Sequence, residues 1–259
     1  MPVTGPRDDT GAAVSVPFPA RRVVSLVPSL TESVAVTAPG LLVGATDWCT
    51  EPAALAVQRV RGTKNPDTAA IIALRPDLVL ANLEENRSAD IEVLRAAGIS
   101  VWVTVITGVD EALRSLGRML SEGCGLPEPG WIGAARRAWD GVTPAAARRG
   151  VIPVWRRPWM VAGRDTFTGD VLARLGVRNV FGTHPDRYPK LTLDQITAAG
   201  PDLAVLPDEP YAFTATDGPE CFPGIEVALV SGRYLTWYGP SLVDAPQVLA
   251  AQLAASRRP

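Results

Sequence analysis

A short segment that occurs twice constrains the fold of this chain more than any other feature. Residues 71–78 (IIALRPDL) resemble residues 196–203 (ITAAGPDL), and the shared Pro-Asp-Leu runs begin at Pro76 and Pro201, a shift of 201 − 76 = 125 residues. In both copies a helical stretch leads through Pro-Asp into an apolar strand. A repeat of this length in a chain of 259 residues predicts two similar lobes in succession.

The order of the expected helices and strands indicates an α/β protein. Short, β-branched apolar runs predict strands, and amphipathic stretches between them predict helices. The expected strands are residues 22–28, 41–45, 76–81, 101–105 and 151–155, with a further strand near 180–181. The expected helices between them are residues 68–74, 91–97 and 168–176. Such alternation of strand and helix predicts parallel β-α-β units.

A helical region separates the two predicted lobes. Residues 109–121 and 131–139 have helical patterns, with a loop at 124–127 between them, and such a segment can act as a stiff strut. Pro144 should interrupt it, because proline inside a helix costs about 3 kcal/mol. We predict two Rossmann-like lobes with parallel sheets, joined by a long connecting helix. The expected divisions are an N-terminal extension (1–20), a lobe (21–106), the connecting helical segment (107–149) and a second lobe (150–259).

Composition excludes several classes of function. No stretch approaches the roughly 18 apolar residues of a membrane span, and a net charge of -2 offers no positive field for nucleic acid. Cys49, Cys124 and Cys221 are far apart, which argues against a disulfide framework and a cysteine-based zinc site. The first residues lack the basic and apolar pattern of an export signal, so we expect a cytoplasmic protein.

The order and spacing of several segments resemble a known family, the helical-backbone metal-chelate receptors of the class III periplasmic-binding-protein type. Residues 22–32 (RVVSLVPSLTE) are similar to that family's first strand and its Ser-x-Thr-Glu helix start. The similarity extends over roughly residues 15–255, through Val43-Gly44, residues 75–79, Gly98-Ile99, residues 176–181 and residues 201–203. The resemblance implies non-catalytic binding of a corrinoid, haem or ferric siderophore in a cleft between the lobes. No cofactor is expected to be required for folding.

The resemblance also identifies two departures from the family pattern. Members that feed membrane transporters carry a docking glutamate at the tip of each lobe, and the matching positions here are Ala69 and Asp194. One carboxylate is absent and the other is on a shorter side chain, so delivery to an ABC transporter is not expected. Sensing, storage or handover of the chelate inside the cell is the expected role.

Aromatic residues gather in loops at the predicted strand ends, although they make up only 6% of the chain. Such rings can stack on a planar macrocycle, and the alternative is that they seal the ends of the lobes. The resemblance favours Trp48, Trp159 and Trp237 as residues that face the cleft. The other aromatic candidates for ligand binding are Tyr188, Tyr211, Phe213 and Tyr238.

Charged residues in the same loops are candidates for polar ligand contacts. Arg156 and Arg157 are expected to bind ligand carboxylates through their planar donors, with solvation or a weak ion pair as the alternative. Lys64 and Arg164 are further candidates of this kind. Glu84 follows a predicted strand directly and is expected to contact polar ligand groups or a cation, unless it only marks a helix start.

Two residues are candidate metal ligands. His184 is the only histidine, and a single imidazole is expected to suffice as axial ligand to a metal that a macrocycle already holds. Cys49 is the rival, although a cysteine binds metal as thiolate and needs a lowered pKa.

Two other functions remain open from the sequence. One is a cytoplasmic enzyme that acts on a tetrapyrrole or another small molecule, with Glu84, Asp208, Glu209 or His184 as acid–base groups, although the common catalytic motifs are missing. The other is the substrate-binding protein of an ABC importer whose export signal precedes the given start.

Overall fold

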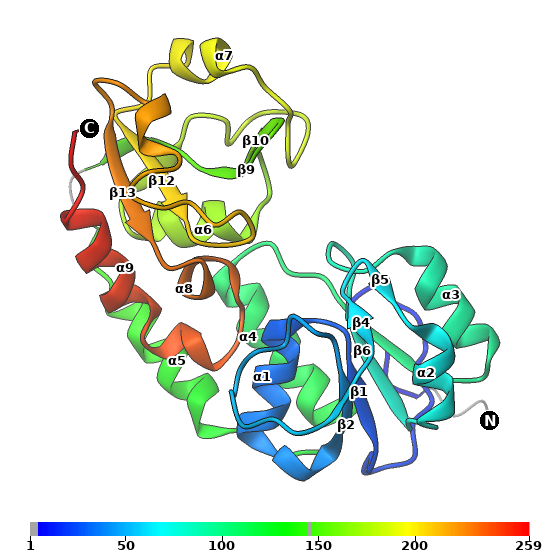
Figure 1. Cartoon of the computed structure of the whole chain (residues 1–259). Coiled ribbons are helices and arrows are strands. Elements are labelled where there is room, and N and C mark those ends of the chain that lie inside the picture. The colour runs from blue at the N-terminus through cyan, green and yellow to red at the C-terminus, as the bar shows by residue number, and fades with distance from the viewer. Residues whose placement is uncertain (1–4, 145–146, 259) are drawn as a thin grey trace. The chain divides into compact units, whose positions relative to one another are not determined.

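The computed structural model describes residues 5–144 and 147–258, which form two compact units (Figure 1). The N-terminal unit comprises the described part of Met1–Ile106, together with Asp110–Gly133 and Tyr238–Pro240. The C-terminal unit comprises Thr107–Val109, the described part of Ala134–Trp237, and that of Ser241–Pro259. The boundary at Gly133 falls inside a helix.

The N-terminal unit is built on a five-stranded sheet in the order β3-β2-β1-β6-β7 (Figure 1). All four neighbouring pairs run parallel. The strands are β1 (Val23–Ser25), β2 (Leu42–Ala45), β3 (Gln58–Arg59), β6 (Leu78–Asn82) and β7 (Val101–Thr104). Every residue of β1, β6 and β7 is buried, as expected for central strands covered on both faces.

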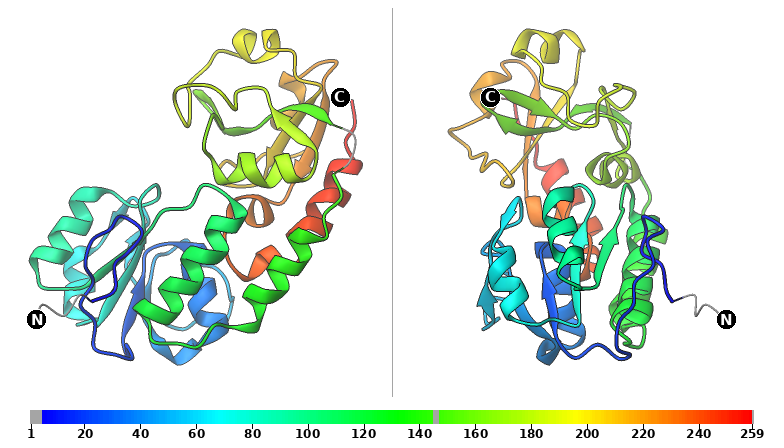
Figure 2. Two further views of the ribbon diagram at one scale, coloured as in Figure 1. Left: turned by 180° about the vertical axis from the view of Figure 1, so that it is seen from behind. Right: turned by 90° about the vertical axis from the view of Figure 1, so that its right-hand side faces the viewer.

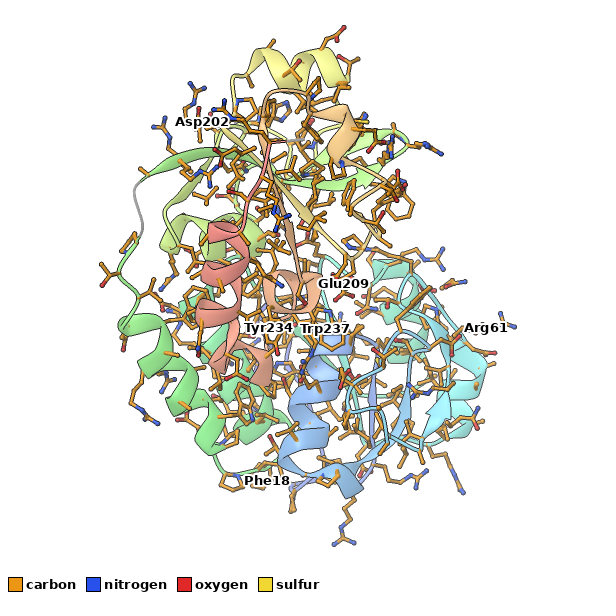
Figure 3. All side chains as sticks on the ribbon, turned by 60° about the vertical axis from the view of Figure 1, so that its left-hand side comes forward. Phe18, Arg61, Asp202, Glu209, Tyr234 and Trp237 are labelled. Carbon is orange, nitrogen blue, oxygen red and sulfur yellow. The ribbon has the colours of Figure 1, made fainter. Side chains whose placement is uncertain are left out.

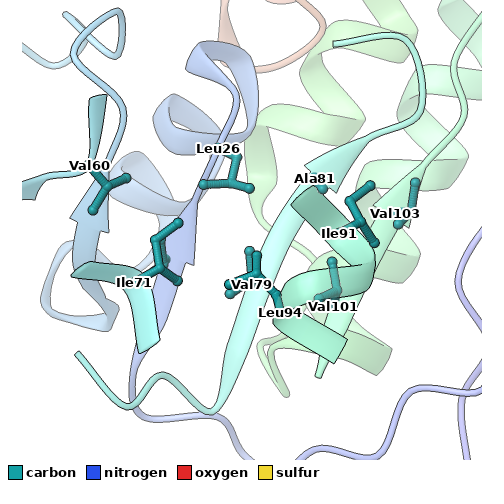
Figure 4. Packing of buried hydrophobic residues seen from close by; sticks show 10 residues of the cluster. Leu26, Val60, Ile71, Val79, Ala81, Ile91, Leu94, Val101 and Val103 are labelled. Atoms are coloured by element: carbon teal, nitrogen blue, oxygen red, sulfur yellow. The ribbon is translucent and has the colours of Figure 1, made fainter. Parts of the chain in front are cut away.

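Helices pack against this sheet through apolar side chains. The helices are α1 (Pro28–Thr37), α2 (Thr68–Ala73) and α3 (Ser88–Ala96), and a small antiparallel pair joins β4 (Arg61–Gly62) to β5 (Asn65–Pro66). Figure 4 shows Ile71 of α2 and Leu94 of α3 among strand residues such as Val79. All three are fully buried. The Asp67 side chain caps α2 by accepting from the N–H of Ala70 at 3.0 Å.

The C-terminal unit has a parallel sheet in the order β11-β8-β12-β13 and an antiparallel hairpin of β9 and β10. The strands are β8 (Arg148–Val151), β9 (Pro153–Arg156), β10 (Trp159–Val161), β11 (Val177–Asn179), β12 (Leu203–Pro207) and β13 (Glu226–Val230). The helices are α6 (Phe167–Arg174), α7 (Leu193–Ala198), α8 (Gly232–Thr236) and α9 (Ala245–Ala254). Thr192 and Gln195 form a reciprocal capping box at the start of α7.

The sequence repeat corresponds to a repeat of structure. α7 begins 193 − 68 = 125 residues after α2, and β12 begins 203 − 78 = 125 residues after β6. β6 lies between β1 and β7, and β12 lies between β8 and β13, so the repeated strand has the same place in both sheets. Ala69 and Asp194 both lie in the first turn of the repeated helix. The predicted α/β fold with two parallel sheets is confirmed.

Some element boundaries differ from the predictions. The predicted strand at 151–155 is divided between β8 and β9, and the strand predicted near 180–181 ends earlier, at Asn179. Between β7 and β8 the chain forms two helices, where the helical patterns at 109–121 and 131–139 were expected, and not one continuous connecting helix. They are α4 (Val109–Arg118), which continues into a π-helical turn (Met119–Gly123), and α5 (Gly130–Asp140). The helical segment ends at Asp140, four residues before the interruption expected at Pro144. Residues 145–146 of the predicted connector, and residues 1–4 of the predicted extension, lie outside the described residues.

Terminal segments cover one edge strand of each sheet. The N-terminal strap, which we define as residues 5–15, runs beside β7 (Figure 2), where the N–H of Asp9 donates to the carbonyl of Val103 at 3.1 Å. At β13, Val227 and Arg257 exchange two main-chain hydrogen bonds of 2.7 and 3.0 Å. An uncovered edge strand offers unpaired main-chain groups to other chains, so both segments protect the sheets. Among the described residues, no helix combines the length and apolar character needed to cross a bilayer.

Candidate functional site

Three loops meet at the carboxyl edge of the N-terminal sheet. Parallel strands bring the segments after β2 and β6 to the same edge, which is where open α/β sheets bind ligands. The turn between β4 and β5 joins them: Asn86 Nδ2 donates to the carbonyl of Thr63 at 2.9 Å, and Lys64 Nζ donates to the carbonyl of Glu84 at 2.5 Å. We call this region the N-terminal edge surface. It contains Trp48, Lys64 and Glu84, three of the residues that are expected from the sequence to bind ligand.

Apolar side chains are exposed on the N-terminal edge surface. Trp48 follows β2 and is 67% exposed, and Leu83 follows β6 and is 53% exposed. Gly62 lies beside the indole, because a Cβ on it would come 3.4 Å from Trp48 Nε1 and only 2.4 Å from Asn65 Oδ1. Exposed apolar side chains at such an edge are typical of a binding surface. Leu83 was not among the sequence candidates, since an exposed leucine has no pattern of its own.

The polar groups of the surface also have structural roles. The ammonium of Lys64 ties the β4–β5 turn to the loop after β6. Within that loop, the side chain of Asn82 accepts hydrogen bonds from the N–H groups of Glu84 and Glu85, at 2.9 and 3.2 Å. These hydrogen bonds fix the turn in which the two glutamates follow the end of β6.

Glu85 is half-buried in this loop, and loss of solvent contact raises the pKa of its carboxyl group, with Lys64 opposing and Glu84 adding to the shift. A pKa above the unfolded value of 4.5 means that the negative charge disfavours the folded state at neutral pH. This destabilisation is absent below pH 4.5 and develops as the pH rises through the folded pKa.

Glu85→Gln is therefore expected to stabilise the protein at pH 7, with a gain that shrinks as the pH falls and disappears below 4.5. Urea unfolding of both proteins between pH 4 and pH 8 measures this difference. A gain that does not change with pH would contradict the assignment to ionisation of Glu85.

Cys49 lies beneath the N-terminal edge surface and not on it. Its thiol is fully buried, with Thr31 Oγ1 at 2.9 Å and Thr46 Oγ1 at 3.1 Å. Burial raises the pKa of this thiol, so the thiolate that a metal requires is disfavoured. The prediction of Cys49 as a metal ligand therefore has no support from its surroundings.

Several predicted ligand-binding aromatics instead build the core of the C-terminal unit. Trp159 stacks with Phe213 at a centroid distance of 6.1 Å and an interplanar angle of 9°, and meets Phe222 edge-on at 5.6 Å. Phe213 is 3% exposed. Phe213 and much of the Trp159 ring therefore fit the alternative interpretation, in which the aromatic residues seal the ends of the lobes.

Trp237 and Tyr238 are also buried, at 7% and 6% exposure, which contradicts their expected place on an open surface. The guanidinium of Arg233 lies 5.9 Å from the centre of the Trp237 ring and 5.4 Å from that of Tyr234. Figure 3 shows Glu209, Tyr234 and Trp237 around α8. Trp237 directly follows α8 in the C-terminal unit, and burial of its large apolar area favours the packing of this short helix, whereas Tyr238 belongs to the N-terminal unit.

The carboxyl edge of the C-terminal sheet has its own set of loops. After β12, the side chain of Asp208 accepts a hydrogen bond from the N–H of Gly232 at 2.6 Å, which joins the loops after β12 and β13. A Cβ on Gly232 would lie 2.2 Å from Cγ of Glu209, so the two loops are in direct contact. We call the loops after β12 and β13 and the β9–β10 hairpin the C-terminal edge surface.

Trp155 is the most exposed aromatic side chain of the described C-terminal unit, at 42%. Its ring meets Tyr211 edge-on at 5.5 Å and 79°. Trp155 was not among the sequence candidates, although the alternation of β9 indicates it, because Val154 before it is buried and successive strand residues point to opposite faces. Arg157 is exposed on the same hairpin and keeps its predicted place.

Arg156 does not have the open position expected of a ligand-binding arginine. Its guanidinium pairs with Asp217 and with Glu220, the latter at 2.5 Å, and its side chain is only 13% exposed. The expected contact with ligand carboxylates is therefore replaced by carboxylates of the protein itself.

A third group of candidates comprises His184 and Tyr188, in the loop before α7, and Arg164, which precedes α6 and contacts that loop. Arg164 Nε donates to the carbonyl of Pro185 at 2.8 Å, and Tyr188 is half-buried. Nδ1 of His184 accepts a hydrogen bond from the N–H of Asp186 at 3.0 Å. This places the imidazole proton on Nε2, where a metal would need the lone pair, so the loop does not favour His184 as an axial ligand. Among the described residues, no three His, Cys, Asp or Glu side chains are grouped to hold a metal ion.

Comparison with known proteins gives relatives along nearly the whole chain, although no family model matches. A vitamin B12-binding protein of Pectobacterium carotovorum is 26% identical over 258 residues, covering 94% of this chain and 91% of the relative. The structure of the periplasmic vitamin B12 binding protein BtuF of Vibrio cholerae is similar with a TM-score of 0.72 and 19% identity, covering 92% and 98% of the two chains. A periplasmic haem binding protein from Pseudomonas aeruginosa has a TM-score of 0.70 and 22% identity, covering 92% and 94%.

The chain is therefore similar in sequence to vitamin B12-binding proteins, and it shares with periplasmic binding proteins of known structure a fold of two α/β units on parallel sheets. Among these proteins, the relatives that it matches in sequence are vitamin B12-binding proteins, and those that it matches in structure include haem-binding proteins. These relatives are named as binding proteins, which agrees with the prediction of a binding protein and not an enzyme.

Proposed function

We propose that the protein binds a metal chelate, most specifically a corrinoid, without chemical turnover, and that the N-terminal edge surface contributes to the binding site. The observation that carries this proposal is the exposed indole of Trp48 on the N-terminal edge surface. An indole in this position provides a flat apolar platform for a conjugated ring. Leu83, in the loop after β6, is also exposed, and hydrogen bonds join that loop to the β4–β5 turn.

A corrinoid is favoured over haem for two reasons. The sequence relatives are vitamin B12-binding proteins, and the binding role comes to this chain from them by similarity. In addition, cobalamin brings a coordinated cobalt with its own lower ligand and needs no axial ligand from the protein. This suits a chain whose single histidine is held with Nδ1 as an acceptor.

Titration of the purified protein with cyanocobalamin, haemin and a ferric siderophore tests the proposal. We expect quenching of tryptophan fluorescence and a shift of the visible bands with cyanocobalamin, and weaker or no response with the other two. Absence of any response to all three compounds would refute the proposed function. A response to haemin alone would keep the binding role and reject the corrinoid.

The place of action inside the cell stays a prediction, together with the expectation that the chain does not feed a transporter. Antibody detection after separation of cytoplasm from periplasm tests the location. Recovery in the periplasmic fraction would favour an importer role. That result would go against the expectation drawn from Ala69 and Asp194, which stand at the positions of the family's docking glutamates.

A further inference from the structure

One arginine ties the β9–β10 hairpin to the long segment that follows β12. We define the 208–222 loop as the residues between the end of β12 and Phe222. Arg156, at the end of β9, pairs through Nη1 with Asp217 of this loop and through Nη2 with Glu220 at 2.5 Å. The same Nη2 lies 3.2 Å from Sγ of Cys221. Three groups of the loop thus converge on a single guanidinium.

The contacts of Arg156 continue to the aromatic residues of the C-terminal edge surface. Asp217 uses its second oxygen, Oδ2, to accept a hydrogen bond from the hydroxyl of Tyr211 at 2.6 Å. The Tyr211 ring in turn meets Trp155 edge-on at 5.5 Å. A series of contacts therefore connects Arg156 through Asp217 and Tyr211 to Trp155, the residue that precedes Arg156 in β9. The exposed indole also donates from Nε1 to the carbonyl of Arg157 at 3.3 Å.

The charge arrangement explains why an arginine is needed at this position. Asp217 and Glu220 are only three residues apart and carry like charges, so they repel each other unless a cation lies between them. A planar guanidinium has several donors in a fixed fork and can serve both carboxylates at once, whereas a lysine ammonium acts as a point charge. Glu220 also accepts from the N–H of Gly218 at 2.6 Å, which fixes the turn between the two carboxylates.

We propose that Arg156 is a positioning residue, which holds the 208–222 loop closed on the hairpin so that Tyr211 and Trp155 form part of the ligand surface. This assigns to Arg156 a role different from direct binding of ligand carboxylates. The effect on ligand affinity rests on the proposed function, whereas the hold on the loop can be measured in the protein alone.

The cysteines of the chain provide a measurement that needs no ligand. Cys49 and Cys124 are fully buried, while Cys221, inside the 208–222 loop, is partly exposed. The labelling rate of Cys221 with a thiol reagent such as DTNB therefore reports opening of this loop. A Cys221→Ser variant identifies the signal, which it should abolish.

Arg156→Gln is expected to raise the labelling rate about 10- to 100-fold, as loss of charge-assisted hydrogen bonds predicts. Arg156→Lys should give an intermediate rate. Arg178→Gln removes the same charge from an exposed position on β11 and should leave the rate unchanged. Burial raises the pKa of the Cys221 thiol and Arg156 opposes that shift, so loss of Arg156 would by itself slow labelling through the pKa. A faster rate is therefore the result expected from opening of the loop. An unchanged or slower rate overturns the proposal.

The second arm measures affinity for cyanocobalamin. Arg156→Gln and Asp217→Asn are each expected to weaken binding about tenfold. The double variant should bind no more weakly than either single variant, because both substitutions break the same series of contacts. If labelling rises while affinity stays unchanged, the loop is not part of the ligand surface and the proposal is overturned. If the unmodified protein binds none of the three compounds, the proposed function fails, and the labelling rates still decide whether Arg156 holds the loop.

Discussion

Replacement of Asp8 by alanine is expected to lower the free energy of unfolding of the N-terminal unit by about 2–4 kcal/mol, because a buried and fully bonded carboxylate is lost. The Asp8 side chain has no solvent exposure. Its Oδ2 accepts from the N–H of Val103 at 3.2 Å and pairs with Arg95 at 3.3 Å. Its Oδ1 accepts from Thr10 and from the N–H of Ala12. Alanine would leave the Val103 N–H buried without this acceptor.

Urea unfolding followed by fluorescence and by amide hydrogen exchange of β7 measures this loss. Glu92→Ala is the matched control, since Glu92 is the other carboxylate that pairs with Arg95 but is 68% exposed, and its loss should change stability by no more than about 0.5 kcal/mol. If Asp8→Ala lowers the free energy of unfolding no more than Glu92→Ala does, the strap contributes little to the stability of the unit.

The second large effect is expected at Trp48. Trp48→Ala should weaken binding of cyanocobalamin about 10- to 100-fold, the loss typical of a central aromatic contact. Stability should change by no more than about 0.5 kcal/mol, because the side chain is 67% exposed and little packing is lost.

Phe18→Ala is the control for this experiment, since Phe18 is 72% exposed but precedes β1, at the opposite end of that strand from the edge surface. Equilibrium titration monitored in the visible bands gives the affinities, and thermal melts give the stabilities. Retention of full affinity by Trp48→Ala would remove the observation on which the proposed function depends.

The fold was accessible from the sequence because its signals are local. β6 and β12 are continuous apolar runs after Pro-Asp, and the distance of 125 residues between them is the same in the sequence and in the structure. Buried parallel strands need no information from distant residues to be recognised. The broken strand around Ile152 and the early end of β11 at Asn179 depend on pairing with other strands, which the local pattern does not contain.

The candidate site was only partly accessible, because exposure depends on partners far away in sequence. Arg156 pairs with Glu220, 64 residues later, and no local pattern distinguishes such an arginine from a free one. Trp48 and Trp237 both occur in aromatic loops, yet one is 67% exposed and the other 7%. Trp237 is buried by packing around α8, whereas Trp48 lies at an open position after β2. Only the folded chain contains that information.

The covered edge strands have a practical consequence for handling the protein. Val103 and Val105 donate main-chain N–H groups to Asp8 and Asp9, and the pairing of Val227 with Arg257 occupies β13. A shortened gene product that begins after residue 15 would offer an open β7 to a second molecule, with aggregation as the natural result. Purification tags and fluorescent labels are therefore better placed in an exposed turn such as 97–98 than fused closely to either end.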